Sequence, residues 1–215
     1  MKLHYFLFIL CLAILPGCGQ KTTGRLLVFG DSISYGAYTS ASYPKLIAEN
    51  FGHELENHSV SSTTLADEAQ IGAIRATKFL AGDKIIFSPG INDALLHRSD
   101  PTYLASYEQL LIEVLDLFEN SGGIAFVGEP LHVLGKGISP ENTAQLVQLN
   151  EDGEVYANIL RRVIVKKAYQ HVHLIESRDQ FHPSPDLMHD GVHPNDRGHR
   201  ELFDIFRKTM ERVLK

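Results

Sequence analysis

The sequence predicts an α/β fold in which a mostly parallel β-sheet is covered by helices on both faces. Short apolar runs bounded by glycine or proline alternate with longer segments whose apolar residues recur at three- and four-residue spacing. Strands that alternate with helices of this length are typical of βαβ crossovers and of a sheet buried on both sides. The sequence has no internal repeat and no low-complexity tract, so we expect one domain over residues 25–215.

The strands are expected where the apolar runs are short and continuous. Residues 25–29 read Arg-Leu-Leu-Val-Phe and are followed by Gly30, as is typical of a buried strand. Four further runs complete the predicted sheet, at 54–60, 84–87, 124–127 and 171–175. The helices are predicted from the period of their apolar residues, at 43–50, 66–80, 103–119, 156–168 and 197–214.

One segment departs from this rhythm. Residues 131–153 contain Gly135, Gly137 and Pro140 and end in Asn-Glu-Asp-Gly, which makes the segment longer than an ordinary connection. Ligands of open α/β sheets bind outside the carboxyl ends of the strands, so a loop here would border a substrate. The alternative is a surface loop that contains a short helix around residues 144–149.

The residues before the domain are predicted to be processing and tether segments. Lys2 gives a basic start, and residues 5–16 form an uncharged run that is shorter than the roughly 20 residues of a membrane-spanning helix. We therefore expect a signal peptide at 1–17. The Leu-Pro-Gly-Cys sequence ending at Cys18 resembles a bacterial lipobox, which predicts lipidation of Cys18 and a lipidated tether at 18–24. The alternative is an ordinary secretory signal followed by a chance cysteine.

Composition limits both the chemistry and the partners. Cys11 lies within the predicted signal peptide and Cys18 would carry lipid, so the mature chain would have no thiol for a disulfide or for cysteine catalysis. The 20 basic and 26 acidic residues give a formal net charge of −6, without an extended basic run. This balance argues against nucleic acid as the main partner.

Three short blocks carry the candidate chemistry. They are Gly-Asp-Ser ending at Ser32, Gly-Ile-Asn-Asp around Asn92, and Asp-Gly-Val-His from Asp190 to His193. Together they supply a nucleophile, an amide donor for an oxyanion and an acid–base pair, which are the parts needed for acyl transfer through a serine ester. Each block alone would be common by chance, whereas three complementary blocks favour a catalytic site.

Ser32 directly follows the first predicted strand, where a tight turn would present its hydroxyl above the sheet. The surrounding sequence lacks the second glycine of the nucleophile elbow, so the α/β-hydrolase fold is a poor match. Considered alone, Ser32 would be interpreted as a helix N-cap, with Asp31 and Ser34 as rival caps.

Asp190 and His193 are the candidate acid–base pair. They lie three residues apart in a segment rich in turn formers, so one carboxylate oxygen can reach Nδ1 and leave Nε2 to accept the serine proton. His189, next to Asp190, is expected to shape the surroundings of this base. The structural alternative, a histidine at the start of the last helix, would not explain the neighbouring aspartate.

Asn92 is the candidate oxyanion donor because its side-chain N–H does not titrate. The alternative is an Asx-turn after the strand that ends at residue 87. Asp93 is then expected to be structural and to cap the next segment.

These residues resemble the motifs of the SGNH (GDSL-type) hydrolase superfamily of esterases, lipases, thioesterases and carbohydrate O-acetylesterases. The resemblance covers almost the whole mature chain and implies a flavodoxin-like three-layer α/β/α sandwich with about five parallel strands. It implies that Ser32 is the nucleophile and an oxyanion donor through its own N–H, and that Asn92 donates from its side chain. It also implies that His193 is the general base and that Asp190 orients it, with no cofactor and no metal.

The second motif of this superfamily normally ends in a glycine whose N–H is a further oxyanion donor. The matching stretch here is 57–63, and it places Ser62 where glycine is usual. The N–H survives this change, but serine resists a positive φ. Ser61 or Thr63 is the alternative donor.

The histidines give no sign of a metal centre. His171 and His173 fall on one face of a predicted strand, and four more histidines lie between residues 182 and 199. No His-Glu-x-x-His pattern and no set of thiolates accompanies them. The sequence therefore does not predict a metal site.

The sequence thus predicts a serine hydrolase that cleaves carboxylic esters of a small molecule, glycan or lipid. It would be lipid-anchored in the bacterial cell envelope, on the periplasmic or outer-membrane side, or otherwise secreted. A thioesterase or a carbohydrate O-acetylesterase would use the same machinery. The alternative of another class is an envelope lipoprotein that binds without catalysis, and Ser62 in place of glycine is the feature in its favour.

Overall fold

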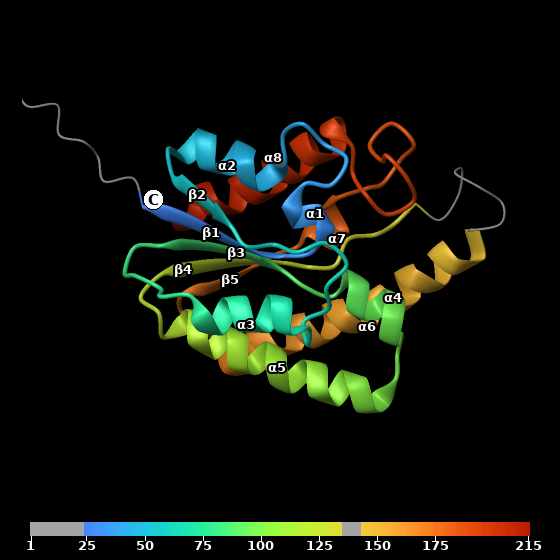
Figure 1. The fold of residues 1–215 in the computed structure, drawn as a ribbon, viewed down its shortest axis with the longest axis horizontal. Helices are drawn as coiled ribbons and strands as arrows, with labels where there is room; N and C mark the ends of the chain where they lie inside the picture. Colours follow the sequence, from blue (N-terminus) through green and yellow to red (C-terminus); the bar gives the residue numbers. More distant parts are fainter. Residues whose placement is uncertain (1–23, 135–142) are drawn as a thin grey trace, which may run out of the picture.

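A computed structural model describes residues 24–134 and 143–215. Its five strands form one parallel sheet in the order β2-β1-β3-β4-β5 (Figure 1). The strands are β1 (Arg25–Gly30), β2 (Glu54–Asn57), β3 (Lys84–Ser88), β4 (Ile124–Gly128) and β5 (Val172–Ile175). All five predicted strands are present, and the predicted flavodoxin-like α/β fold is confirmed.

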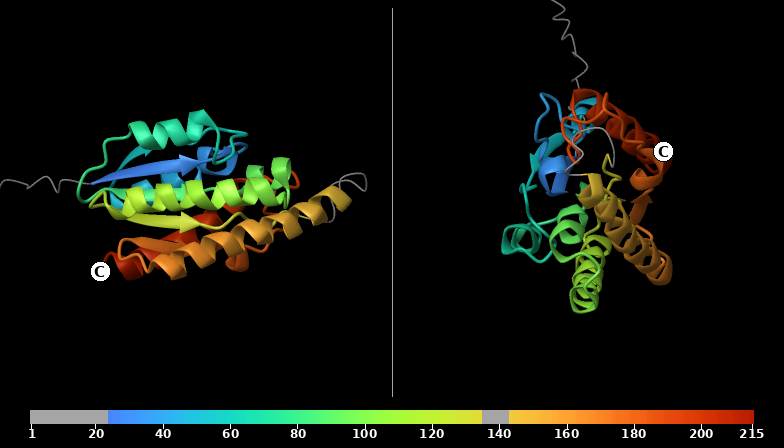
Figure 2. Two further views of the ribbon diagram at one scale, coloured as in Figure 1. Left: turned by 90° about the horizontal axis from the view of Figure 1, so that it is seen from below. Right: turned by 90° about the vertical axis from the view of Figure 1, so that its right-hand side faces the viewer.

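Helices cover both faces of the sheet. The longer ones are α2 (Tyr43–Phe51), α3 (Glu68–Ala76), α5 (Pro101–Glu119), α6 (Thr143–Lys167) and α8 (Asp196–Val213). Three short ones were not predicted, namely α1 (Ser32–Tyr35), α4 (Ile91–His97) and α7 (Ser177–Gln180). In Figure 1, α2 and α8 lie above the sheet, and the left view of Figure 2 shows α3, α5 and α6 over the opposite face.

The central strands are apolar in their interiors because both of their faces are covered. Residues 26–29 of β1 and 85–87 of β3 are almost fully buried. A parallel sheet between two helical layers leaves no solvent face, so continuous apolar runs replace the alternating pattern of a half-exposed sheet. Each fully buried side chain of this size contributes about 1.5–3 kcal/mol of transfer free energy.

Two strand-end glycines let helices pack directly against the sheet. A Cβ on Gly30 would lie 2.6 Å from Oγ of Ser34 in α1. A Cβ on Gly128 would lie 2.8 Å from the ring of Phe206 in α8. Gly30 therefore allows α1 to pack closely against the end of β1, next to the candidate site.

A continuous loop over 131–153 is wrong, because α6 begins at Thr143 and includes the run that ends at Gly153. The alternative, a short helix around residues 144–149, is right about helix at these residues but not about its length, since they belong to α6. The low helix propensity of this run is offset by tertiary contacts. Ser99 Oγ donates to Asp152 at 2.7 Å, and a Cβ on Gly153 would lie only 3.1 Å from Nη1 of Arg178. Glycine is thus retained inside the helix because a guanidinium occupies the space beside it. Residues 135–142 lie outside the described residues.

The sheet brings every candidate site residue to one edge. α1, α4 and the chain that leads into α8 all follow carboxyl strand ends, on the right of Figure 1. The right view of Figure 2 looks onto this edge. None of the helices described here is long and apolar enough to cross a membrane. The predicted signal peptide and Cys18 lie outside the described residues.

Candidate active site

The candidate nucleophile lies in the turn between β1 and α1. Asp31 is the N-cap of α1, and its carboxylate accepts a hydrogen bond from the Ile33 N–H at 2.9 Å. Because Asp31 is the cap, the Ser32 hydroxyl is free for another partner. Ser32 is 8% exposed, so this hydroxyl lies in a recess rather than on open surface.

The structure joins Ser32, His193 and Asp190 in one hydrogen-bonded relay. Oγ of Ser32 lies 2.9 Å from Nε2 of His193, which is 161 residues away in the chain. Nδ1 of the same imidazole lies 2.8 Å from Oδ2 of Asp190. With the imidazole neutral and its proton on Nδ1, Nε2 is placed to accept the serine proton.

The turn that carries Asp190 and His193 is closed by its own backbone. Oδ1 of Asp190 accepts the N–H of Val192 at 2.7 Å and of His193 at 2.6 Å, and the His189 N–H donates to the His193 carbonyl at 2.8 Å. Partial burial would raise the pKa of Asp190, but the hydrogen bonds from His193 and Val192 hold it below its ordinary value. The carboxylate is therefore ionised beside the imidazole.

Asn92 lies at the start of α4, after the carboxyl end of β3. Its Nδ2 donates to the Thr63 carbonyl at 2.9 Å, which fixes the direction of the amide. An amide nitrogen has two N–H bonds, so a second one is left for a ligand. Gly90 is the N-cap of α4 with φ of 109°, and this left-handed backbone is what requires glycine there.

Ser62 adopts the conformation that its side chain disfavours. Its φ is 63°, in the left-handed region that glycine occupies most easily. The flanking backbone is held on both sides: the Val60 N–H donates to the Gly30 carbonyl at 3.0 Å, and the Leu65 N–H donates to the Asp93 carboxylate at 3.1 Å. Such contacts over-determine the turn and keep the strained residue in place.

Asp93 is structural, as predicted, but it does not cap the next segment. It is 1% exposed and accepts a hydrogen bond from the Tyr103 hydroxyl at 2.7 Å. Asp100 caps the following helix, α5, through the Tyr103 N–H. Burial raises the pKa of Asp93 above its ordinary value, and its bonds to Tyr103 and Leu65 offset this only in part. Asp93 therefore holds the chain after Ser62, through Leu65, while β1 holds the chain before Ser62, through Val60.

Asp31 combines a structural role with an unusual protonation equilibrium. The carboxyl group is 4% exposed, and burial raises its pKa to about 7, with the Ile33 N–H opposing the shift. Beside it lies a small cavity of about 20 Å³, which is lined by neighbours of Ser32 and Asn92 rather than by the relay itself. This cavity lies on the inner side of the nucleophile turn, so we do not assign the substrate to it.

Sequence reasoning missed Tyr38. Its ring stacks on His189 with the centroids 4.3 Å apart and the planes 8° from parallel, and its centroid lies 5.1 Å from that of His193. His189 therefore does lie beside the candidate base, as expected. Tyr38 belongs to no motif, and the sequence shows only that it is an aromatic residue shortly after Ser32.

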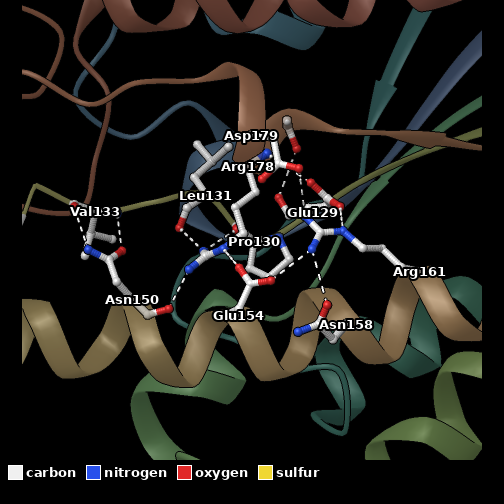
Figure 3. Close-up of polar contacts among 11 residues, drawn as sticks. Glu129, Pro130, Leu131, Val133, Asn150, Glu154, Asn158, Arg161, Arg178 and Asp179 are labelled. Carbon is white, nitrogen blue, oxygen red and sulfur yellow. Dashed lines mark hydrogen bonds and ion pairs between the residues drawn. The ribbon is translucent and has the colours of Figure 1, made fainter.

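Sequence reasoning also missed a group of charged residues near the carboxyl end of β4, which we call the Arg178 cluster (Figure 3). Its members are Glu129, Glu154, Arg161, Arg178 and Asp179. Arg178 is 1% exposed, and its guanidinium donates to Glu154 at 2.7 Å and to the Pro130 carbonyl at 2.9 Å. No sequence pattern identifies these partners because they meet only in the folded chain.

The Arg178 cluster fixes the chain that follows β4. Asn150 of α6 holds Val133 through both of its backbone groups, at 2.8 and 2.9 Å (Figure 3). The next residue, Leu134, donates its N–H to the Gly191 carbonyl at 2.8 Å. A Cβ on Gly191 would lie 2.6 Å from Cδ1 of Leu146 in α6, so α6 packs closely against this turn. The cluster thereby supports the turn that holds Asp190 and His193.

Two of the histidines considered for metal binding, His171 and His173, have other neighbours. Nδ1 of His171 lies 3.6 Å from Glu119, and the His173 ring packs against Phe126 with the centroids 5.8 Å apart. Across residues 24–134 and 143–215, no group of three or more histidine, cysteine, aspartate and glutamate side chains is placed to hold a metal ion.

A flavodoxin-like sheet that carries a serine, a histidine and an aspartate in one relay at its carboxyl edge defines a class of proteins, the SGNH-type ester hydrolases. The model of the GDSL-like lipase/acylhydrolase family matches residues 28–201, and the chain belongs to this family. The protein is therefore an ester hydrolase. No curated protein matches the sequence.

Solved structures with this fold include three similar ones. A lipolytic protein of the G-D-S-L family from Veillonella parvula has 18% sequence identity and a TM-score of 0.65, over 88% of this chain and 100% of that one. An acetylxylan esterase from Geobacillus stearothermophilus has 18% identity and a TM-score of 0.61, over 88% and 94%. A psychrotrophic esterase from a Pseudoalteromonas species has 17% identity and a TM-score of 0.60, over 89% and 98%. At these identities the likeness concerns the fold.

Proposed function

We propose that the protein hydrolyses carboxylic esters through an acyl-enzyme, with Ser32 as nucleophile, His193 as general base and Asp190 as its orienting carboxylate. The observation that carries the proposal is the continuous relay from Ser32 Oγ through His193 to Asp190. Family membership independently supports an ester as the substrate. The relay requires neither a metal nor a cofactor for this chemistry.

In the first half-reaction, Ser32 Oγ forms a bond to the ester carbonyl carbon while its proton passes to Nε2 of His193. Asp190 stabilises the imidazolium, because its ionised carboxylate accepts from Nδ1 at 2.8 Å. When the tetrahedral intermediate collapses, the bond to the alcohol oxygen breaks and Nε2 returns the proton to that oxygen. Water then repeats the two steps on the acyl-enzyme and releases the acid and free Ser32.

The negative charge on the intermediate needs donors that are already in place. We assign this role to the N–H groups of Ser32 and Ser62 and to the side chain of Asn92. The Thr63 carbonyl directs the Asn92 amide, and Ser62 immediately precedes Thr63 in the chain, in a left-handed backbone conformation. Each such donor typically contributes about 10²–10³ in turnover.

Replacement of Ser32 by alanine tests the proposal. We expect turnover of a p-nitrophenyl acyl ester to be lost, whereas a Ser34→Ala variant, two residues away, keeps its nucleophile. Unchanged turnover in Ser32→Ala would reject Ser32 as the nucleophile. A fluorophosphonate probe gives a second test: the relay should be labelled at Ser32, while a lipoprotein that only binds its ligand should not be labelled.

The acyl group of the substrate can be identified by measuring the hydrolysis of esters that differ only in their acyl chains. An acetylxylan esterase is among the proteins that share the fold, which favours a short acyl group on a carbohydrate as the second candidate. A series of esters with one alcohol and lengthening acyl chains, run beside a thioester, separates this from a lipase or thioesterase. A carbohydrate O-acetylesterase should reject acyl groups longer than a few carbons.

We further propose that the enzyme is anchored in the cell envelope through lipid on Cys18. The Leu-Pro-Gly-Cys sequence at the end of an uncharged apolar run supports this. Metabolic labelling with a fatty acid should mark the wild-type chain and the Cys11→Ser control but not Cys18→Ser. Equal labelling of both variants would reject the anchor.

A further inference from the structure

Tyr38 has a strained backbone conformation, and burial of its side chain does not offset the cost of that strain. Its φ is 62°, in the left-handed region that a bulky residue rarely adopts, at a cost of about 1–2 kcal/mol. Even so, the side chain is 58% exposed and contributes little to the core. Strain held at an exposed residue is characteristic of functional sites.

The strained segment is tied firmly to the start of α8. Thr39 Oγ1 and the Ser40 N–H both donate to the Asp196 carboxylate, at 2.5 and 2.8 Å. At its other end, the Ala37 N–H donates to the Ser32 carbonyl at 2.9 Å. The loop therefore connects the nucleophile helix to the element that follows His193, and it holds Tyr38 between them.

The Tyr38 ring lies against the base of the relay. It stacks on His189, and its centroid is 5.1 Å from the His193 ring, at an angle of 63°. In the proposed reaction, Nε2 of His193 gives its proton to the alcohol oxygen, so that oxygen comes within hydrogen-bond distance of Nε2. The group attached to the oxygen therefore extends from the imidazole that the Tyr38 ring contacts. The assigned donor Asn92 belongs to α4, which lies across the sheet from α8 in Figure 1.

We infer that Tyr38, supported by His189, forms the wall of the subsite for the alcohol part of the ester, and that this subsite favours alcohols that carry a ring. The inference rests on the proposed function and determines specificity within it. The exposed face of a tyrosine ring packs best against a flat partner, either an aromatic ring or the C–H face of a sugar ring. A small open-chain alcohol gains little from such a wall.

Three acetate esters of primary alcohols test the inference while the acyl group and the leaving-group chemistry stay constant. They are ethyl acetate, benzyl acetate and a methyl glucopyranoside acetylated at its primary hydroxyl. The variants are Tyr38→Asn, which tolerates the left-handed backbone, and Tyr38→Phe, which keeps the ring. Tyr35→Asn is the matched control, because Tyr35 is a similarly exposed tyrosine, 60% exposed, at the end of α1.

We expect Tyr38→Asn to lower kcat/KM for the ring-bearing esters by about three- to tenfold relative to ethyl acetate, and Tyr38→Phe and Tyr35→Asn to keep the wild-type ratio. The benzyl and glucoside arms tell an aryl alcohol from a sugar. Because the readout is a ratio within one preparation, a partly unfolded variant does not distort it. An equal fall for all three esters, or no change, would overturn the inference. Failure of the proposed function looks different: wild type and Ser32→Ala would then hydrolyse all three esters equally poorly.

Discussion

The Ser32–His193–Asp190 relay and the Arg178 cluster are both charged, hydrogen-bonded groups at the carboxyl edge of the sheet, but their designs are opposite. In the relay, the side chains of His193 and Asp190 are 21% and 40% exposed. In the cluster, Arg178 is 1% exposed, and each of its guanidinium nitrogens has an acceptor. Arg178 is enclosed by acceptors from the protein itself, whereas the relay is open to a ligand. In this protein, a buried charged group therefore stabilises the fold and does not by itself indicate a reactive site.

The two regions are nevertheless joined. The cluster fixes residues 129–134, and the Leu134 N–H reaches the Gly191 carbonyl inside the Asp190–His193 turn. Arg161 adds a second layer through Glu129 at 2.6 Å and Glu154 at 2.9 Å. Damage to the relay should therefore remove activity from a stable protein, while damage to the cluster should lower stability first.

The largest effect is expected for Asp190→Asn. An amide cannot hold the required tautomer of His193 or stabilise its imidazolium, so kcat should fall on the order of 10⁴-fold. Urea unfolding should change little, because Asp190 is partly exposed. Steady-state turnover and unfolding of the same preparation provide the measurements. Asp186→Asn, an exposed carboxylate on the approach to the same turn, is the control, and a loss of less than about tenfold in Asp190→Asn would contradict the assigned role.

Arg178→Met should have the opposite profile. Loss of the guanidinium leaves three backbone carbonyls, those of Pro130, Leu131 and Asn150, without this donor, and it leaves Glu154 with Arg161 alone. The free energy of unfolding should therefore fall by about 3–5 kcal/mol. The matched control is Arg162→Met, which breaks an exposed pair with Glu108 at 2.8 Å and should cost at most about 1 kcal/mol. Urea denaturation measures both variants. Similar losses for the two arginines would show that burial does not distinguish the cluster.

This contrast also explains which parts could be predicted from the sequence. The strands and the long helices follow from local apolar periodicity, and Asp190 and His193 lie close enough in the chain for one turn to suggest their contact. Arg178 meets Glu154 and Pro130 only through the fold, so no local pattern identifies it. The continuity of α6 from Thr143 to Lys167 was missed for the same reason, because its polar, glycine-containing first turns are stabilised by distant residues.

Asn92→Ala should produce an intermediate loss. Removal of one assigned oxyanion donor should lower kcat by about 10²–10³-fold with little change in KM, because the donor acts on the transition state. Loss of the bond to Thr63 should also loosen the Ser62 turn slightly. Asn158→Ala, on the exposed side of the Arg178 cluster, controls for the removal of an amide. A rise in KM with constant kcat would instead assign Asn92 to substrate binding.

Asp31→Asn should change the pH dependence of stability. The folded pKa of about 7 lies above the ordinary 3.8, so the folded protein holds a proton that the unfolded chain releases between these values. The contribution is thus complete below about pH 3.8 and is lost as the pH rises to about 7. Asparagine keeps the cap but cannot titrate, so the wild type should lose about 2–3 kcal/mol more than the variant between about pH 5 and about pH 8.

The effect of Asp31 is measured as the difference in unfolding free energy between the wild type and Asp31→Asn at each pH. His199 is fully buried, and burial lowers its pKa to about 4, so its contribution is present above about pH 6.5 and is lost as the pH falls through about 4. This opposes the trend from Asp31 over part of the same range, but it is common to both proteins and cancels. Parallel pH profiles for wild type and Asp31→Asn would contradict the raised pKa.

The smallest effect is expected for Ser62→Gly. Glycine takes a φ of 63° without the side-chain penalty, so the free energy of unfolding should rise by about 1 kcal/mol. Ala168→Gly is the matched control, because Ala168 has φ of 50° just after α6, far from the relay in sequence and at the opposite edge of the sheet. If both variants gain stability, the strain at Ser62 is purely local. The N–H remains in Ser62→Gly, so a fall in kcat beyond about tenfold would show that the serine side chain itself takes part in the site. Ser62 would then be a functional departure from the glycine of the family motif, whereas a gain in stability alone would make it a tolerated one.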